Sequence, residues 1–389
     1  MKLAPYTLFS VETYRERLGQ ARIALQQHRL DAAICVAPEN QYYLCGFDSW
    51  TAANSPQALV FTRGSDEPTL ILRDVDITLA TESACITDIR SYRLHSENFA
   101  WRIRDILAEK GVKGGRLGVE SQSYAIVDAL GQSLREALGD YELTDATNVL
   151  GALRLVKSTD EIALIERAGR FANRGLEAMA AALVPGVTEL ELAGEIEREV
   201  RSAGSEYWAI PVELTSGDRS AGCHGTPRRR EIQSGDLVHA EFAGVSERYH
   251  ATAIQTICCG SAGARERELY NIALESLDAG VAAIAPGVSV ADVESASLEP
   301  LVRHGLEDAA MMRFGYGIGI AYPPIWLETL QISRDFNTLL QPGMVFVLHS
   351  CLELPDEKLG VIQGGTYVLE DSDARMLAGA GSLALAEVG

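Results

Sequence analysis

LRLVKSTDEIALIERAG, residues 153–169, constrains the fold of this chain more than any other stretch. Ser158 or Thr159 can cap a helix here, because a side-chain oxygen at the cap accepts a hydrogen bond from a backbone N–H of the first turn. Asp160 and Glu161 then lie where acidic side chains stabilise the positive end of the helix dipole. The apolar residues recur at helical spacing, so we predict a long amphipathic helix.

The chain after this helix contains both helical and strand-like segments. They predict an α+β domain over residues 151–389. The helical stretches lie at 189–203 and 264–284. The strand-like segments form two expected antiparallel pairs, 235–244 with 247–260 and 344–354 with 361–371.

The first 150 residues alternate between helical and strand-like patterns. Helical spacing over 11–30 leads into the apolar run at 31–37, which is short enough for a buried strand. ALVFT (58–62) and TLILR (69–73) are separated by a turn rich in Gly, Ser, Asp and Pro, which predicts a hairpin. We therefore expect an α/β domain over residues 1–150.

Composition excludes several classes of partner. The chain has 389 residues, is 47% hydrophobic and carries a net charge of −20. That charge argues against a nucleic-acid partner, because such binding relies on basic patches. No apolar run approaches the roughly 20 residues that span a bilayer, so no membrane partner is expected. We expect a small molecule as the partner.

The seven cysteines form no CxxC pair and no evident disulfide framework, which favours a reducing compartment. Cys258 and Cys259 lie in an apolar strand-like run and are expected to be buried thiols. The start MKLAPYTLFS lacks the features of a signal peptide. Together these observations predict a cytoplasmic protein.

Three segments of the C-terminal half resemble the pita-bread hydrolases, which include aminopeptidase P, prolidase, methionine aminopeptidase and creatinase. They are the helix at 153–169, GDLVHAEFAG at 235–244 and QPGMVFVLHS at 341–350, in the same order as in that family. The resemblance implies an α/β N-terminal domain of the creatinase type and an α+β pita-bread catalytic domain. By analogy with the family it also implies a homodimer.

The resemblance also identifies five positions that hold two metal ions in the peptidases of this family, through two Asp, one His and two Glu. In this chain the matching residues are Glu241, Thr252, Tyr316, His349 and Gly364. Thr, Tyr and Gly do not build a two-metal site. The sequence therefore predicts chemistry by protein side chains, with no metal and no other cofactor.

Other segments resemble one branch of the family. AGCHGTPRRREIQSGD (221–236) is similar to the creatinase segment with the catalytic His, which corresponds to His224. The segments at 42–50, 239–256 and 314–328 resemble ectoine hydrolases. The chain departs from both: it lacks the aromatic and Arg that creatinase uses to hold creatine, and an acidic residue near 364. These departures put both substrates in doubt.

His224 and Glu241 are the two predicted catalytic residues. An imidazole titrates near neutral pH, so His224 can pass a proton to a leaving nitrogen. Glu241 lies in an apolar strand, where a carboxylate needs a partner or a raised pKa, and either condition suits a base or a group that orients water. The structural alternatives are a surface His and a Glu on the solvated face of the strand.

Seven more residues are predicted to bind the substrate. Tyr316 lies in a Gly-rich loop, where its hydroxyl can donate to a developing oxyanion. Trp326 and Glu328 follow two prolines and can hold a cationic heterocycle by stacking and charge. A Tyr or Trp buried in the core is the alternative. The full set is Tyr316, Tyr322, Trp326, Glu328, His349, His250 and Trp50.

The leading functional hypothesis is a metal-independent hydrolase that cleaves a C–N bond of a small amidine, guanidine or amide. Two other functions stay open. In the first, the same site catalyses a lyase or cyclase reaction on a modified amino acid. In the second, the chain binds a small molecule without turnover. One further alternative for the site is a single metal ion bound by His239, His250 and His349, since zinc accepts three His ligands.

Overall fold

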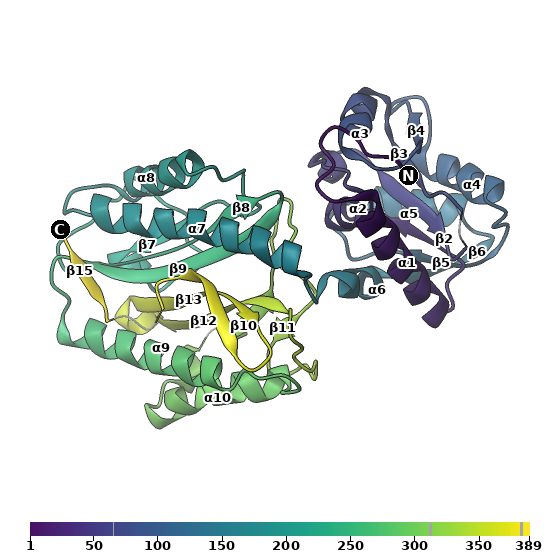
Figure 1. Cartoon of the computed structure of the whole chain (residues 1–389). Coiled ribbons are helices and arrows are strands. Elements are labelled where there is room, and N and C mark those ends of the chain that lie inside the picture. Colours follow the sequence, from purple (N-terminus) through teal and green to yellow (C-terminus); the bar gives the residue numbers. More distant parts are fainter. Residues whose placement is uncertain (65, 311–312, 382–383) are drawn as a thin grey trace. The chain divides into compact units, whose positions relative to one another are not determined.

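The computed structural model describes residues 1–64, 66–310, 313–381 and 384–389. The chain divides into two compact units, Met1–Arg154 and Leu155–Gly389 (Figure 1). The expected boundary at residue 150 lies in helix α6 (Thr147–Gly151), at the end of the first unit. Within the described ranges, no helix combines the length and the apolar content that a membrane crossing requires.

The first unit is built around a six-stranded mixed sheet with the strand order β4-β3-β2-β1-β5-β6. The expected hairpin is confirmed, because β2 and β3 pair antiparallel. The strands are β1 (Ala32–Cys35), β2 (Ala58–Thr62), β3 (Thr69–Arg73), β4 (Asp88–Tyr92), β5 (Gly115–Val119) and β6 (Tyr141–Asp145). The other helices are α1 (Val11–Gln27), α2 (Pro38–Cys45), α3 (Ile77–Ser83), α4 (Phe99–Glu109) and α5 (Asp128–Ala137).

The second unit begins with the predicted long helix, α7 (Thr159–Ala182). Ser158 is its N-cap and forms a capping box with Glu161, in which each side chain accepts a hydrogen bond from the other residue's backbone N–H. The other helices are α8 (Glu189–Ser202), α9 (Ala264–Ala282) and α10 (Val290–Arg303). The sequence pattern did not predict α10, which packs on α9.

A nine-stranded sheet forms the centre of this unit, with the main order β11-β10-β12-β13-β9-β8-β7. Two long antiparallel pairs, β8 with β9 and β12 with β13, confirm the four predicted strands. The strands are β7 (Glu213–Ser216), β8 (Leu237–Ser246), β9 (Tyr249–Cys259), β10 (Gly315–Gly317), β11 (Gln331–Ile332), β12 (Val345–Leu354), β13 (Leu359–Leu369), β14 (Ala374–Gly379) and β15 (Ala386–Val388).

The unit contains two copies of one arrangement, a pair of helices followed by three strands, although no repeat is visible in the sequence. Helices α7 and α8 precede β7, β8 and β9, and helices α9 and α10 precede β10, β12 and β13. Helix α7 contacts β8 and β9, whereas α9 contacts β12 and β13 (Figure 1). The two long hairpins meet where β13 pairs with β9.

Strand alternation separates the helix-facing side of this sheet from the opposite side. Phe242 and Gly244 of β8 face α7, because a Cβ at Gly175 would meet the Phe242 ring and a Cβ at Gly244 would meet the Ala168 carbonyl. Leu348 of β12 packs in a cluster with residues of α9 and α10. Since successive side chains of a strand point to opposite faces, the odd-numbered residues near Glu241 and His349 point away from the helices. We call this side the open face.

Candidate active site

The registers of five neighbouring strands form one row of residues on the open face. His349 pairs with Gly364, Gly364 with Ile254, Ile254 with Glu241, and Glu241 with Glu213. Residues directly opposite each other in an antiparallel pair share a face. Thr252 also lies on this face, since it pairs with Ala243, two residues after Glu241. The structure therefore brings the resemblance-based positions to one side of the sheet.

A chain of hydrogen bonds holds the carboxyl group of Glu241. The Tyr316 hydroxyl donates to Glu241 Oε1 at 2.7 Å, and the Trp326 indole Nε1–H donates to the Tyr316 oxygen at 3.0 Å. All three side chains are buried. Tyr316 and Trp326 thus position Glu241 through a satisfied network, and such networks lock a side chain into one geometry.

Burial raises the pKa values of two carboxyl groups that lie opposite each other, those of Glu241 and Glu213. Desolvation raises the pKa of Glu241 to about 7, while the hydrogen bond from Tyr316 and the charge of Arg313 pull it down. Burial also raises the pKa of Glu213, and the charge of Glu241 raises it further. Because two like charges in a desolvated site resist ionising together, the pair retains a proton near neutral pH.

His349 and Thr252 each present an unsatisfied polar atom near this carboxyl group. Among the residues that the structure describes, His349 Nδ1 and Thr252 Oγ1 are buried without a hydrogen-bond partner. The His349 ring lies 6.0 Å from the Tyr316 ring, centroid to centroid. Burial lowers the pKa of His349 to about 4, with further lowering by Arg313 and His224. Buried polar atoms are normally satisfied, so these two atoms indicate a place for a polar ligand.

His224 lies in an exposed loop beside an open cleft of about 570 Å³. The cleft is lined by Thr215, Asp218, Arg219, Gly222, Cys223, His224, Gly225 and Glu353. The charge of His224 contributes to the lowered pKa of His349. The catalytic role predicted for His224 stays a prediction, and its solvent access is compatible with proton exchange.

The other two histidines of the single-metal alternative are engaged by the protein. His250 is fully buried, and its Nε2 accepts from the Ala209 N–H at 3.1 Å while its Nδ1 lies 2.8 Å from the Arg248 carbonyl. His239 Nε2 lies 2.8 Å from Thr215 Oγ1 and 3.0 Å from the Ser220 carbonyl. With both ring nitrogens of His250 occupied, this residue fits a structural role better than the predicted substrate contact.

Three other predicted substrate residues have different surroundings. Glu328 is buried in an ion pair with Lys157, with 2.5 Å between Oε2 and Nζ, so its charge is already compensated. Tyr322 is buried, and its ring centroid lies 5.9 Å from Arg248 Cζ. Trp50 lies in the first unit with 59% of its surface exposed. Their predicted roles in substrate binding stay predictions.

Sequence reasoning missed Glu213, Cys351 and Glu353. Glu213 lies in the short strand β7, whose pairing with β8 brings it opposite Glu241. Cys351 and Glu353 follow His349 at intervals of two on β12, so all three share a face. This spacing is the signal in the sequence that could have identified Cys351 and Glu353 alongside His349.

The five residues that the resemblance matches to the family's metal ligands do not fit two divalent ions. Glu241 is the single carboxylate, with a raised pKa and one oxygen engaged by Tyr316. The pKa of Tyr316 is far above its usual value because of burial and the charge of Glu241, which keeps the phenol protonated. A Cβ at position 364 would collide with the Leu348 carbonyl oxygen, so no side chain fits there without local change. Two-metal sites need several anionic oxygen ligands at close spacing.

Comparison with known proteins supports the fold and modifies the functional interpretation. A Xaa-Pro dipeptidase of Pyrococcus furiosus is 26% identical over 93% of this chain and 97% of its own length. The ectoine hydrolase of Halomonas elongata is 27% identical over 93% and 96%. The solved Xaa-Pro dipeptidase of Bacillus anthracis superposes with a TM-score of 0.85 at 21% identity, over 96% of this chain and all of its own. The predicted two-domain fold class is confirmed.

The prediction of a metal-independent hydrolase acting on C–N bonds other than peptide bonds is wrong. Further relatives and solved structures are named as dipeptidases, one of them a putative one, or prolidases, and the ectoine hydrolase does not stand apart from them in identity. The superfamily resemblance is confirmed, but its creatinase and ectoine hydrolase branch is not supported. Residues 239–256 form parts of strands β8 and β9. The sequence pattern of these strands is set by the fold, so similarity there does not distinguish family members with different substrates.

Two family models together cover most of the chain. The creatinase/prolidase N-terminal domain matches residues 17–156. The metallopeptidase family M24 matches residues 163–372, more than half of the chain. The chain therefore belongs to metallopeptidase family M24, a family of hydrolases.

Proposed function

We propose that this chain hydrolyses the amide bond of a dipeptide-like substrate at the open face of the second unit. The observation that carries the proposal is the buried Glu241 carboxyl, fixed by Tyr316 and flanked by the unsatisfied atoms of His349 and Thr252. Membership in family M24 and the dipeptidase names of several relatives support this substrate class.

Glu241 has the properties of a general base. Its hydrogen bond from Tyr316 fixes Oε1, and a pKa near neutrality lets the carboxylate accept a proton from water. The oxygen of this water forms a bond with the carbonyl carbon of the substrate, and the C–N bond then breaks. His224 supplies a proton to the leaving nitrogen. The products are a carboxylic acid and an amine.

His349 and Thr252 orient the substrate in this account. The neutral imidazole of His349, with its pKa lowered to about 4, offers Nδ1 to a polar group of the substrate. Thr252 Oγ1 offers a hydroxyl from the neighbouring strand. A ligand that satisfies both atoms recovers the free energy lost when they were buried without partners, roughly 1–3 kcal/mol for each group.

The pH dependence of turnover should report the ionisation of Glu241. Because the base form is the carboxylate, kcat/KM of the wild type should rise with pH through a midpoint near 7, the raised pKa of this group. Tyr316→Phe removes a hydrogen bond that lowers this pKa, so its midpoint should move to higher pH. A pH profile of kcat/KM for both proteins measures the shift, and coincident midpoints would contradict the assigned role of Tyr316.

His224→Ala should lower kcat/KM by roughly 100-fold, the lower end of what a positioned proton donor contributes. The side chain is exposed, so the substitution should leave the melting temperature almost unchanged. Steady-state kinetics and thermal unfolding measure the two quantities. Arg229→Ala, an exposed substitution in the same loop region, serves as the control. Equal turnover by His224→Ala and the control would exclude His224 as the proton donor.

The proposed function is tested with purified full-length protein and a panel of substrates. The panel contains Xaa-Pro dipeptides, other dipeptides, N-acyl amino acids and ectoine, each with and without added divalent cations. We expect release of free amino acids from at least one dipeptide. Hydrolysis of ectoine alone, or ligand binding without any product, would overturn the proposal.

A further inference from the structure

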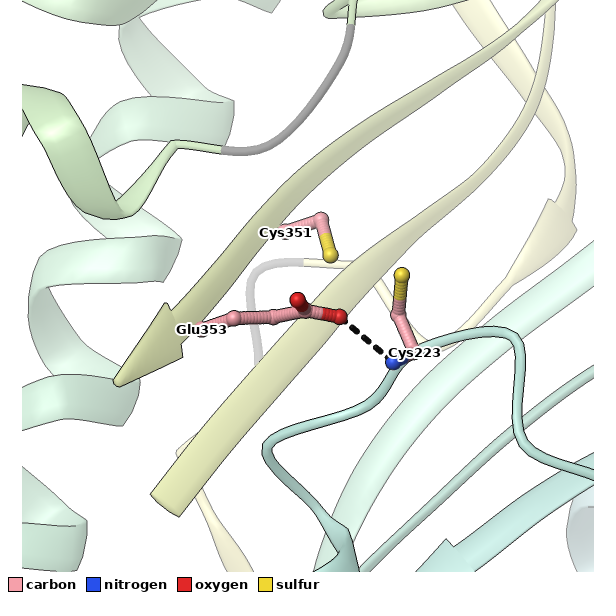
Figure 2. Close-up of side chains that lie close together, drawn as sticks. All are labelled: Cys223, Cys351 and Glu353. Atoms are coloured by element: carbon pink, nitrogen blue, oxygen red, sulfur yellow. Dashed lines mark hydrogen bonds between the residues drawn. The ribbon is translucent and has the colours of Figure 1, made fainter. Parts of the chain in front are cut away.

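A cluster of side chains whose atoms can act as metal ligands lies beyond His349 on the open face. The sulfur atoms of Cys223 and Cys351 and a carboxylate oxygen of Glu353 all lie within 4.8 Å of one another. Figure 2 shows the three side chains converging from strand β12 and from the loop that contains Cys223. None of the three is among the five residues that the sequence resemblance matches to the family's metal ligands.

The strand and the loop hold this cluster together in a defined way. Cys351 and Glu353 alternate along β12 and therefore point to the same face. The backbone N–H of Cys223 donates to Glu353 Oε1 at 2.6 Å, which fixes the loop against the strand (Figure 2). Both cysteines are buried and free of disulfide bonds, so their thiols are protected and close together.

We propose that Cys223, Cys351 and Glu353 bind one zinc ion. Zinc is tetrahedral and accepts thiolate and carboxylate ligands at about 2.3 Å and 2.0–2.2 Å. Two sulfur ligands of such a site lie about 3.8 Å apart, because two 2.3 Å zinc–sulfur bonds meet at the tetrahedral angle. The ligand atoms lie within 4.8 Å of one another, so only small side-chain movements are needed to bring them to zinc-binding distances. Soft sulfur ligands favour zinc over magnesium or calcium, which prefer oxygen.

A fourth ligand of the proposed zinc ion would approach from the cleft. Cys223 and Glu353 line that cleft together with His224 and Arg219. Three protein ligands and one open position are the pattern of catalytic zinc sites, whereas structural sites use four protein ligands. The bound ion would thus face the same solvent-filled space as the proposed proton donor. Zinc binding is independent of the proposed peptide hydrolysis, and its test measures the metal directly.

The test uses full-length protein freed of metal by a chelator, kept reduced, and then mixed with Zn²⁺ or Co²⁺. We expect one zinc per chain after gel filtration, and a near-ultraviolet thiolate-to-cobalt charge-transfer band with Co²⁺. Cys223→Ser, Cys351→Ser and Glu353→Gln should each weaken zinc binding by more than about tenfold, because each removes a ligand. The Glu353 side chain is partly exposed and Gln has nearly the same shape, so the Glu353→Gln variant should fold even if a variant of a buried cysteine does not.

Two control variants distinguish this site from nonspecific thiol binding and from metal binding at the family positions. Cys258→Ser removes a buried thiol of β9 outside the cluster and should bind zinc like the wild type. His349→Gln, at a family position, should also retain zinc. The proposal is overturned if no zinc is bound, if all variants bind alike, or if His349→Gln abolishes binding while Glu353→Gln does not. A Cys223–Cys351 disulfide in place of zinc binding under reducing conditions would also overturn it.

Discussion

Glu241→Gln should lower kcat/KM for the hydrolysed dipeptide by about 10³-fold, within the range that general-base catalysis contributes. The amide keeps the size of the side chain and can still accept from Tyr316, but it cannot take a proton from water. The change should fall mainly on kcat, because the substitution removes a step of the chemistry more than a binding contact. Steady-state kinetics at pH 8 measures this, where the wild-type carboxylate is ionised.

Stability provides an internal check on the same variant. The pKa of Glu241 is raised on folding, so the folded protein binds more protons than the unfolded chain between the ordinary carboxyl range and pH 7. Its ionisation therefore costs stability as the pH rises through this window. Glu241→Gln should raise the melting temperature relative to wild type more at pH 8 than at pH 5. Lower stability together with lower activity would indicate misfolding instead of a lost base.

The matched control for the loss of a carboxylate is Glu299→Gln. Glu299 lies on the exposed surface of α10 and pairs with Arg303, so its substitution should change neither kcat/KM nor the pH profile. If Glu241→Gln retained activity comparable to this control, Glu241 would not be the base. The neighbouring Glu213 would then be the carboxylate to examine next.

Lys157→Met should destabilise the second unit by about 3–5 kcal/mol, the usual cost of breaking a buried ion pair by removing one partner. The side chains of Lys157 and Glu328 are each only 2% exposed, and the substitution removes the Lys157 cation from the buried Glu328 carboxylate. For a unit of this size, the melting temperature should fall by roughly 10 °C. Thermal unfolding followed by circular dichroism at neutral pH measures the change.

The double variant Lys157→Met/Glu328→Leu tests the cause of this loss. With both charges gone, most of the lost stability should return, because neither charge of the pair remains buried. Arg303→Met, which breaks exposed pairs with Glu275 and Glu299, should cost less than about 1 kcal/mol. A small effect of Lys157→Met would mean that Glu328 is neutral or solvated, and would reopen its predicted role in binding a cationic substrate.

The sequence predicted the parts of the fold that depend on local pattern. The cap at Ser158, the amphipathic α7 and the two long hairpins follow from spacing and capping rules that act within a few residues. Alternation along β8 also correctly placed His239 and Glu241 on one face. Helix α10 was missed, since Pro300 and several Ser and Glu residues blur its apolar spacing.

The rest of the candidate site depends on pairing between distant segments. Glu213 reaches Glu241 only through the β7–β8 register, and Glu328 meets Lys157 across 171 residues. Tyr316 and Trp326 were identified as site residues, but the hydrogen-bond chain that links them to Glu241 joins residues 75 positions apart in the sequence. Local residue patterns contain no information on such registers, which explains why these partners were not predicted.

Hydrolysis in heavy-oxygen water tests the central claim most directly. Wild-type protein and Glu241→Gln are incubated with a dipeptide substrate in H₂¹⁸O, and the products are analysed by mass spectrometry. The account predicts that one ¹⁸O enters the newly formed carboxylate with the wild type, and that this labelled product is nearly absent with Glu241→Gln. An unlabelled product, or equal labelled product from both proteins, would contradict the claim that Glu241 activates water for amide hydrolysis.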